Sequence, residues 1–333
     1  MSRVSVIGAG SWGCAFASLL AQNGVDTCLF VRKNEVLESL KRQRIHPHYL
    51  PGVKLSESIV FTGSIAEAME RADVVVVAVP VKYMRTVLHG LLNFVQNRHV
   101  FLSLSKGIEN ETFLRPTGII TDVLGVDESR TAALSGPNFA LEVAKGLPTA
   151  TVIASTNQRL AKALQRLVSC SNFRAYTSDD VIGVEVAGAM KNVIAIASGI
   201  SDGLGLGYNA KASLITRGLA EISRLGLMFG ARRDTFMGLA GIGDLVLTCT
   251  GDLSRNRRVG LVIAKEGRPE DFLGPSGMVA EGINTVRSAY EISLKKGIEM
   301  PITTEVYRII YQKKDPQQAV FELMSRPLKS ENL

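Results

Sequence analysis

One lysine and one aspartate have the surroundings that proton transfer to a carbonyl oxygen requires. Lys191, followed by Asn192, lies inside the otherwise apolar segment Val186–Ile196, where a lysine is unusual. Burial disfavours an ammonium and lowers the pKa of a lysine towards neutrality, so that its amine can exchange a proton with an alcohol. Asp244 follows the glycines of Gly241–Gly243 on a predicted turn, from which it would align the lysine with a substrate hydroxyl. The alternatives are a lysine that extends from a core helix into water and an aspartate that only caps a helix.

Groups that would hold an anionic substrate occur at two further places. Arg255 and Asn256, after Ser254, offer a guanidinium fork and a carboxamide for phosphate oxygens. Lys106 stands just past Val100–Leu104, which has the pattern of a buried strand. Open α/β sheets bind ligands at the carboxyl ends of their strands, so this position suits a substrate contact. A basic surface turn at 254–256 and an ordinary surface lysine at 106 are the alternatives.

The segment Gly8–Gly13, GAGSWG, is a complete G-x-G-x-x-G sequence between a strand pattern and the apolar helical pattern Ala15–Ala21. In a dinucleotide-binding fold the first glycine permits a tight turn and the second lets the backbone approach a pyrophosphate. The third allows close packing of helix on strand, and the helix N-terminus attracts the anion. The alternative is a glycine turn without a ligand.

The residues after the second predicted strand, Thr27–Val31, indicate which dinucleotide is bound. A site that prefers NAD places Asp or Glu there, to accept hydrogen bonds from the ribose 2′-hydroxyl. This chain has Arg32 and Lys33, whereas Asp26 comes at the start of the strand, several residues too early. Two cations suit a 2′-phosphate, so NADPH is expected to be favoured, with NADH also accepted. A solvated strand end is the alternative.

Short β-branched or apolar segments in the first half of the chain are mostly separated by amphipathic segments of helical length. This alternation predicts an α/β domain over residues 1–178, with a doubly wound, mostly parallel sheet of the Rossmann type covered by helices on both faces. The predicted strands are Val4–Ile7, Thr27–Val31, Ile59–Phe61, Val74–Val79, Val100–Leu104, Ala132–Leu134, Ala150–Ile153 and Arg174–Tyr176.

Strand patterns cease after Ser178, and residues 179–333 are predicted to form an all-helical domain. Gly203, Gly205 and Gly207 are expected to end its first helix, and Gly241, Gly243 and Gly251 are expected to punctuate a loop-rich region between helices. Loops of this kind often carry chemistry. The predicted helices are Asp179–Ser201, Ala210–Phe229, Val259–Ala264, Thr285–Lys296, Met300–Ile310 and Pro316–Met324.

The bulk properties fit a soluble two-domain enzyme that acts on a phosphorylated small molecule. The chain has 333 residues and a net charge of +7, but its basic residues are scattered and not interleaved with aromatics, which argues against nucleic-acid binding. Cys14, Cys28, Cys170 and Cys249 form no C-x-x-C pair, so neither a metal site nor a disulfide framework is expected. The longest unbroken apolar run, Val74–Val81, is too short to span a membrane, and no signal segment precedes the first strand. We therefore expect a cytoplasmic protein.

Seven ordered blocks resemble the bacterial members of the NAD(P)-dependent glycerol-3-phosphate dehydrogenase family, over essentially the whole chain. Asn138 and Gly251 depart from the family pattern, in which serine is usual at both positions. The resemblance implies a Rossmann domain and a helical domain arranged as in 6-phosphogluconate dehydrogenase, and reduction of dihydroxyacetone phosphate to sn-glycerol 3-phosphate with NAD(P)H. The blocks are GAGSWG (Gly8–Gly13), LSKGIE (Leu104–Glu109), SGPNFA (Ser135–Ala140), AGAMKNVIAIASGISDGLGLG (Ala187–Gly207), GLAGIGDLVLTC (Gly238–Cys249), SRNRRVG (Ser254–Gly260) and VAEGI (Val279–Ile283).

The same resemblance assigns roles to individual residues. Lys191 would accept the proton in glycerol-phosphate oxidation, with Asp244 and Lys106 as the other catalytic candidates. Substrate contacts are implied for Lys106, Gly136, Asn138, Lys191, Asn192, Asp244, Thr248, Ser254, Arg255 and Asn256. Dinucleotide contacts are expected for Gly8, Gly10, Ser11, Trp12, Gly13, Arg32, Lys33, Lys106, Ala140, Arg255, Val279 and Glu281.

Two other functions share part of this pattern. A two-domain hydroxyacid or ketopantoate-type reductase has a Rossmann domain and a catalytic lysine, but lacks the phosphate-binding pattern at Asp244 and Ser254–Asn256. A non-catalytic dinucleotide sensor has no use for Lys191 and Asp244. The product, glycerol 3-phosphate, would feed phospholipid synthesis. An apolar helical domain is also compatible with a homodimer.

Overall fold

The structure is a computed structural model that describes residues 3–266, 280–328 and 330–331. The chain divides into two compact units. The first unit comprises Met1–Lys106 and Leu114–Val184, and the second comprises Gly107–Phe113 and Glu185–Leu333. The short segment Gly107–Phe113 therefore belongs to the second unit, although both of its neighbours in sequence belong to the first.

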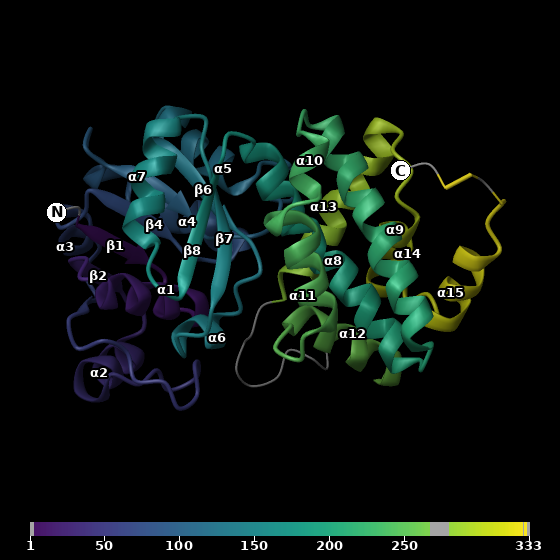
Figure 1. Ribbon diagram of the computed structural model, residues 1–333, viewed down its shortest axis with the longest axis horizontal. Coiled ribbons are helices and arrows are strands. Elements are labelled where there is room, and N and C mark those ends of the chain that lie inside the picture. The colour runs from purple at the N-terminus through teal and green to yellow at the C-terminus, as the bar shows by residue number, and fades with distance from the viewer. Residues whose placement is uncertain (1–2, 267–279, 329, 332–333) are drawn as a thin grey trace. The chain divides into compact units, whose positions relative to one another are not determined.

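The first unit is built on a sheet flanked by helices (Figure 1). The sheet has eight strands in the order β3-β2-β1-β4-β5-β6-β7-β8. Neighbouring strands are parallel except β6 and β7, which are antiparallel. The predicted strands and the mostly parallel sheet are thereby confirmed. The strands are β1 (Val4–Ile7), β2 (Thr27–Phe30), β3 (Val60–Thr62), β4 (Val74–Val77), β5 (Val100–Ser103), β6 (Thr131–Ser135), β7 (Thr149–Ala154) and β8 (Phe173–Ser178).

Helices cover both faces of this sheet because successive side chains of a strand point to opposite faces. Val74 and Val76 of β4 pack in one core with α1, α2 and α7, whereas Val75 and Val77 pack in the other with α3, α4 and α5. A strand buried on both faces needs apolar residues at every position, which accounts for four successive valines. The helices are α1 (Ser11–Gln22), α2 (Asn34–Gln43), α3 (Ile65–Glu70), α4 (Val81–His89), α5 (Pro116–Leu124), α6 (Ala140–Ala144) and α7 (Gln158–Val168), with 3₁₀ turns at Leu92–Phe94 and Glu128–Arg130.

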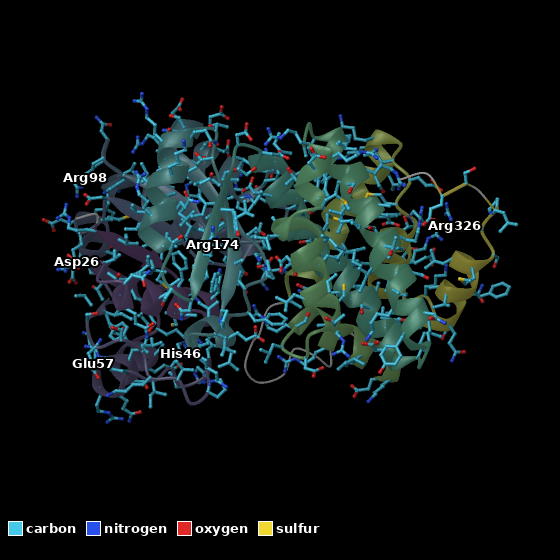
Figure 2. The ribbon with its side chains drawn as sticks, in the orientation of Figure 1. Asp26, His46, Glu57, Arg98, Arg174 and Arg326 are labelled. Atoms are coloured by element: carbon cyan, nitrogen blue, oxygen red, sulfur yellow. The ribbon has the colours of Figure 1, made fainter. Side chains whose placement is uncertain are left out.

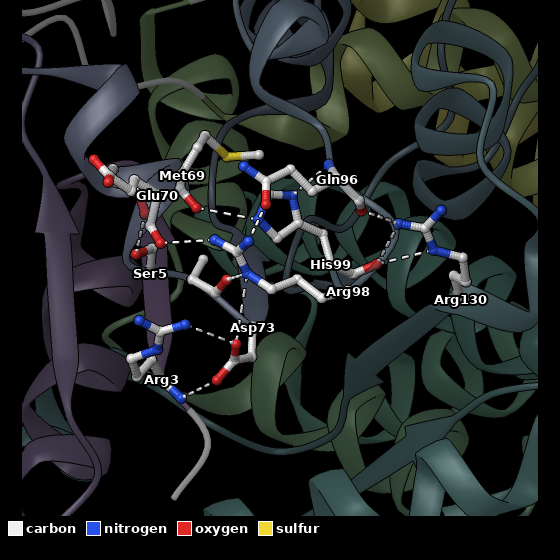
Figure 3. Close-up of polar contacts among 11 residues, drawn as sticks. Arg3, Ser5, Met69, Glu70, Asp73, Gln96, Arg98, His99 and Arg130 are labelled. Atoms are coloured by element: carbon white, nitrogen blue, oxygen red, sulfur yellow. Dashed lines mark hydrogen bonds and ion pairs between the residues drawn. The ribbon is translucent and has the colours of Figure 1, made fainter.

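The amino edge of the sheet is closed by its own polar side chains (Figure 3). The Arg98 guanidinium donates to the carbonyl oxygens of Ala72 at 3.1 Å and Glu70 at 2.7 Å. Asp73, at the start of β4, accepts from the backbone N–H of Arg3 at 3.0 Å and pairs with its guanidinium at 3.2 Å. These groups satisfy one another's hydrogen-bonding capacity, so we assign this edge of the sheet a role in stability and not in ligand binding.

His99 belongs to the same network and is fully buried (Figure 3). Its Nδ1 accepts from the backbone N–H of Gln96 at 3.0 Å, and its Nε2 lies 3.1 Å from the carbonyl oxygen of Met69. A backbone N–H only donates, so Nδ1 carries no proton and the Nε2–H donates to Met69. Burial lowers the pKa of His99, in keeping with a neutral ring.

The described part of the second unit is helical, as predicted (Figure 1). Its longest helix ends at Gly203, and Gly205 and Gly207 have positive φ angles at the turn into the next helix. The helices are α8 (Val181–Gly203), α9 (Gly207–Met228), α10 (Arg233–Phe236), α11 (Asp244–Thr250), α12 (Arg255–Glu266), α13 (Glu281–Lys296), α14 (Pro301–Gln312) and α15 (Pro316–Met324), and the π-helical segment η3 (Leu239–Gly243) precedes α11.

Helix α8 is long and apolar enough, by length and composition alone, to cross a membrane. The pair Arg233–Thr250 and Arg255–Glu266 passes the same test only when segments bent by 44° count as one span. Our search for unbroken apolar runs overlooked α8, because Glu185, Lys191 and Asn192 interrupt it. Since 89% of its most apolar window is buried inside the protein, its side chains are already covered without lipid.

The prediction of a loop-rich region around Gly241, Gly243 and Gly251 is wrong for residues 239–250. The structure forms η3 and α11 there, with lengths of 5 and 7 residues. A Cβ at Gly241 would lie 2.1 Å from the carbonyl oxygen of Phe236. The backbone of Gly241 leaves the helical range (φ −90°, ψ −106°), so the glycine is required by close backbone packing at a kink between two helical segments.

Candidate functional site

The strand order of the sheet reverses between β1 and β4, and the chain segments that follow these two strands touch. A Cβ at Gly8, whose φ is +120°, would lie 2.5 Å from the carbonyl oxygen of Ala78, which follows β4. A Cβ at Gly13 would lie 1.9 Å from the carbonyl oxygen of Gly8. These contacts agree with the predicted tight turn and close helix packing. Open α/β sheets bind ligands at this kind of reversal.

Gly10 differs from its two neighbouring glycines because space is open around it. Among the described residues, and apart from its chain neighbours, no atom lies within 4 Å of the place that a Cβ would take at Gly10, which is the residue before α1. The Trp12 ring lies edge-on to Phe16 at 5.7 Å, and its buried indole N–H has no partner among the described residues. A dinucleotide pyrophosphate would fit this place. It would find space at Gly10, the N-terminus of α1 and the indole N–H of Trp12 as a donor. Ser11 begins the helix.

The cations predicted to select the dinucleotide follow β2 directly. Arg32 and Lys33 are exposed, and Lys33 is the residue before α2. Asp26, labelled in Figure 2, lies at the other end of β2 and pairs with Arg71 at 3.3 Å. The carboxyl end of β2 is therefore followed directly by two cations, whereas Asp26, directly before the strand, is engaged at its other end.

Lys106 lies past the carboxyl end of β5, where it contacts the segment that follows β6. Its Nζ donates to the carbonyl oxygen of Gly136 at 3.1 Å and to Oδ1 of Asn138 at 3.0 Å. Asn138 in turn donates to the Thr151 hydroxyl at 3.3 Å. Asn138, one of the two departures from the family pattern, thus holds Lys106 in place. The structure brings three predicted substrate residues together here, with Ala140 at the start of α6.

Lys191 and Asp244 form a buried ion pair within the second unit. Nζ of Lys191 lies 2.5 Å from Oδ1 of Asp244, and the two residues are 7% and 0% exposed. Asp244 is the first residue of α11, and its carboxylate pairs with Lys191, so it does more than cap a helix. The snorkelling alternative for Lys191 is wrong, because its ammonium ends in the interior. The carboxylate compensates the charge of the ammonium inside the protein.

Two buried carboxamides connect three helices beside this pair. Oδ1 of Asn256 on α12 accepts from the backbone N–H of Gly282 on α13 at 3.0 Å. Its Nδ2 therefore faces Asn192 on α8 and donates to Oδ1 of that residue at 2.8 Å. The NH₂ group of Asn192 is thereby turned away from Asn256, at 3.5 Å from the Gly188 carbonyl oxygen. A donor adjacent to Lys191 in sequence is suited to an oxygen-rich ligand.

Ser254, Arg255 and Asn256 lie together at the start of α12, where Asn256 is buried and Arg255 is exposed, so the alternative of a basic surface turn does not describe Asn256. Ser254 is buried, and its hydroxyl accepts from the backbone N–H of Arg257 at 3.2 Å, capping the helix. Arg255 is exposed at the first helical position. Thr248 is buried and donates to the Asp244 carbonyl oxygen at 2.6 Å. A helix N-terminus flanked by an arginine favours an anion.

Comparisons with known proteins bear on both units. The family model of the NAD-dependent glycerol-3-phosphate dehydrogenase N-terminus matches residues 3–161, and the model of the C-terminus of the same enzymes matches residues 180–321. The chain belongs to this family. It is 49% identical over 330 residues to glycerol-3-phosphate dehydrogenase (NAD(P)+) of Geobacter sulfurreducens, which covers 99% of this chain and 98% of that protein.

Solved structures agree with this family membership. The crystal structure of glycerol-3-phosphate dehydrogenase from Coxiella burnetii matches with a TM-score of 0.93 and 37% identity, over 98% of this chain and 99% of that one. A ketopantoate reductase family structure from Ralstonia eutropha has a TM-score of 0.62 and 14% identity, over 96% and 99% of the chains, which shows a shared fold alone. The identity to the glycerol-3-phosphate dehydrogenases, which is far higher than that to the ketopantoate reductase, supports the dehydrogenase interpretation over the ketopantoate-type alternative.

The predicted site residues of this dehydrogenase family member fall into two sets, one in each unit. The first set is the glycine loop with Arg32, Lys33, Lys106 and the segment 136–140. The second is built on α8, α11, α12 and the start of α13, where Glu281 is the first residue. Val279 lies outside the described residues.

Two residues near these sets were missed by the sequence analysis. The hydroxyl of Thr151 accepts a hydrogen bond from the side-chain amide of Asn138, and Nε2 of His46 lies within hydrogen-bond distance of the Ala9 carbonyl oxygen in the glycine loop. Each is a single polar residue outside any motif, so no signal in the sequence marks it. Cys249, by contrast, follows Thr248 but is buried, and burial raises the pKa of its thiol to about 12, which leaves it unreactive.

Proposed function

We propose that this protein reduces dihydroxyacetone phosphate to sn-glycerol 3-phosphate with a nicotinamide dinucleotide. The buried ion pair of Lys191 and Asp244, in a chain of this family, is the observation that carries the proposal. The relatives named above bear the name of this activity. Residues 1–178 would bind the dinucleotide, and residues 179–333 would bind the substrate and carry the proton donor.

Lys191 is the proposed proton donor. As an ammonium, it gives a proton to the ketone oxygen while the adjacent carbon is reduced, and it takes that proton back in the reverse reaction. Asp244 directs the Nζ atom and favours its charged form. General acid help of this kind contributes roughly 10²–10⁴-fold to the rate. The dinucleotide, when bound, supplies the hydride from its nicotinamide ring.

The phosphate group of the substrate is proposed to lie at the first turn of α12. Arg255 offers a guanidinium fork, and the start of the helix offers backbone donors next to Ser254. Asn256 contributes chiefly by turning the NH₂ group of Asn192, since its own oxygen is already used by Gly282. Substrate contacts are further proposed for Asn192 and Thr248, and for Lys106, Gly136 and Asn138 of the other set.

NADPH is the proposed preferred cofactor. The exposed Arg32 and Lys33 after β2 support it, because a 2′-phosphate needs positive charge where the ribose 2′-hydroxyl would otherwise need an acid. Glu281, Val279, Ala140 and Arg255 are proposed as further dinucleotide contacts. We also propose a cytoplasmic location, supported by four free cysteines, and a role in supplying glycerol phosphate for phospholipid synthesis. A homodimer is proposed from the apolar helical unit.

The deciding experiment follows the loss of reduced-nicotinamide absorbance with purified protein and dihydroxyacetone phosphate, in parallel with NADPH and NADH. Turnover with release of glycerol 3-phosphate is the expected result, with the larger kcat/KM for NADPH. A protein that binds NADPH but turns over neither cofactor would refute the proposed reaction. Equal kcat/KM values would refute the cofactor preference alone.

A further inference from the structure

His46 is a buried histidine whose hydrogen bonds are all made to backbone groups. It lies in the segment between α2 and β3, is 5% exposed and is labelled in Figure 2. Its Nδ1 lies 3.1 Å from the backbone nitrogens of both His48 and Tyr49. Its Nε2 lies 3.0 Å from the carbonyl oxygen of Ala9, inside the glycine loop.

These contacts determine the protonation of the His46 ring. A backbone N–H only donates, so Nδ1 must be the acceptor for both His48 and Tyr49 and carries no proton. The proton of the neutral ring is then on Nε2, which donates to Ala9. The packing agrees with a neutral ring, since the Tyr49 ring lies 4.8 Å away at a tilt of 41° and burial is the main cause of a lowered pKa.

The bond to Ala9 determines the direction of the next peptide group. In a trans peptide the C=O of one residue and the N–H of the next point in opposite directions. Because the Ala9 carbonyl faces His46, the N–H of Gly10 faces away from it. Gly10 is the residue before α1, and in the part of the chain that the structure describes no atom beyond its chain neighbours lies within 4 Å of a Cβ built there. The His46 ring thus contacts the loop on the side opposite to the Gly10 N–H.

We propose that His46 is a positioning residue for dinucleotide binding. It holds the Ala9–Gly10 peptide in the orientation that presents the Gly10 N–H to the pyrophosphate, so the loop loses less freedom when the dinucleotide binds. The pyrophosphate is common to NADPH and NADH. Loss of the His46 contact therefore weakens both by the same factor, unlike a change at Arg32, which alters their ratio.

His99 is a matched control for the His46 experiment. It is equally buried, its Nδ1 also accepts from a backbone N–H, and its Nε2 also donates to a carbonyl oxygen, but at the amino edge of the sheet. The variants are His46→Ala, His99→Ala and His46→Gln. Glutamine places an NH₂ group about where Nε2 of His46 stands and keeps the donor to Ala9.

The test compares dinucleotide binding in these full-length variants. We expect His46→Ala to raise the dissociation constants and KM values of NADPH and NADH about fivefold, with kcat at saturating cofactor unchanged. His99→Ala lowers the melting temperature but leaves both dissociation constants at the wild-type value, and His46→Gln restores tight binding. Equal dinucleotide affinity in the two alanine variants would overturn the proposal. If His46→Ala does not fold, weak binding by a folded His46→Gln overturns it instead.

The inference rests on the proposed function only through dinucleotide binding, and the two can fail separately. Trp12 is the single tryptophan of the chain and lies in the glycine loop, so its fluorescence reports NADPH binding without turnover. Wild-type protein that binds NADPH but does not reduce the ketone sinks the proposed reaction and leaves the His46 test intact. Wild-type protein that binds neither dinucleotide refutes both.

Discussion

At the scale of single residues, the pairing of Lys191 with Asp244 determines what either side chain can do. The two are 53 positions apart and meet in the interior at 2.5 Å. Removing one partner of such a pair leaves the other charge buried and uncompensated, which costs several kcal/mol in typical proteins. Variants at Lys191 must therefore be judged by turnover per folded molecule.

We expect Lys191→Ala to lower kcat about 10²–10⁴-fold, because a general acid is removed. The affinity for NADPH should change little, since the glycine loop is untouched. Steady-state kinetics on folded protein, checked by circular dichroism, measure both quantities. Near-normal turnover of the variant would show that Lys191 is not the proton donor.

Arg32→Asp should shift the cofactor preference from NADPH towards NADH. An acid at this place repels a 2′-phosphate and accepts hydrogen bonds from a ribose 2′-hydroxyl. The measurement is the ratio of kcat/KM values for the two cofactors, which we expect to fall at least tenfold, equivalent to about 1.4 kcal/mol. A ratio equal to that of the wild-type protein would remove Arg32 from the cofactor site.

At the scale of elements, the second set of site residues depends on the close approach of α8 and α12. A Cβ at Gly199 would lie 1.9 Å from the carbonyl oxygen of Arg257, and one at Gly260 would lie 2.1 Å from that of Ile196. The backbones therefore touch without intervening side chains. This contact fixes how far Asn256 stands from Asn192.

Gly199→Ala should lower the free energy of unfolding by roughly 2–3 kcal/mol, because backbone atoms cannot make room for the added methyl group. It should also raise KM for the phosphorylated ketone, since α12 carries Arg255. Gly118→Ala in α5 is the matched control: its Cβ meets only Leu114 at 3.4 Å, and alanine favours a helix by up to about 1 kcal/mol. Denaturant unfolding that gave both variants the same stability would contradict this account.

The same scale shows how much of the fold could be predicted. Strands β1 to β7 were predictable because they are rich in apolar or β-branched residues, and β1 begins and ends at the predicted residues; β8 instead alternates buried and exposed side chains. Segments α10, η3 and α11 were not, because pieces of 4 to 7 residues are too short to show helical periodicity. The glycines of this region favoured a loop, whereas Gly241 is required by its close packing against the backbone of Phe236.

The candidate site was predictable only where one residue contradicts its surroundings. Lys191 in an apolar run and the glycine loop after β1 are such cases. The bond from Gly282 through Asn256 to Asn192 has no local signal, because it joins three helices. The contact of His46 with Ala9 spans 37 positions and rests on a ring geometry that only the folded chain creates.

At the scale of the whole molecule, stability should depend on pH through its buried histidines. Burial lowers the pKa of His46 from 6.5 to about 4, with His48 contributing in the same direction. Between these values the unfolded chain binds a proton that the folded chain does not, so falling pH favours unfolding. The stabilising contribution of neutral His46 is complete above pH 6.5 and is lost by about pH 4.

The effect of His46 is measured as the difference in unfolding free energy between the wild-type protein and His46→Gln. The unfolding free energy of wild type minus that of His46→Gln should decrease by about 3 kcal/mol from pH 7 to pH 4. Other titrating groups, such as Glu221 with its pKa raised to about 7, act in both proteins and cancel. Denaturant titrations at intervals of pH provide the values. A difference that does not vary with pH would mean that the folded protein protonates His46 as readily as the unfolded chain.

The segment Gly107–Phe113 affects the order in which contacts form while the chain is synthesised, because it belongs to the second unit. Its Ile108 carbonyl and Asn110 side chain accept from the hydroxyl of Ser288 on α13, which is made about 180 residues later. Every strand of the sheet has left the ribosome by then. The sheet can therefore assemble before Gly107–Phe113 forms its hydrogen bonds with Ser288. A chain stopped at residue 184 therefore contains the whole first unit together with one piece of a unit that does not yet exist.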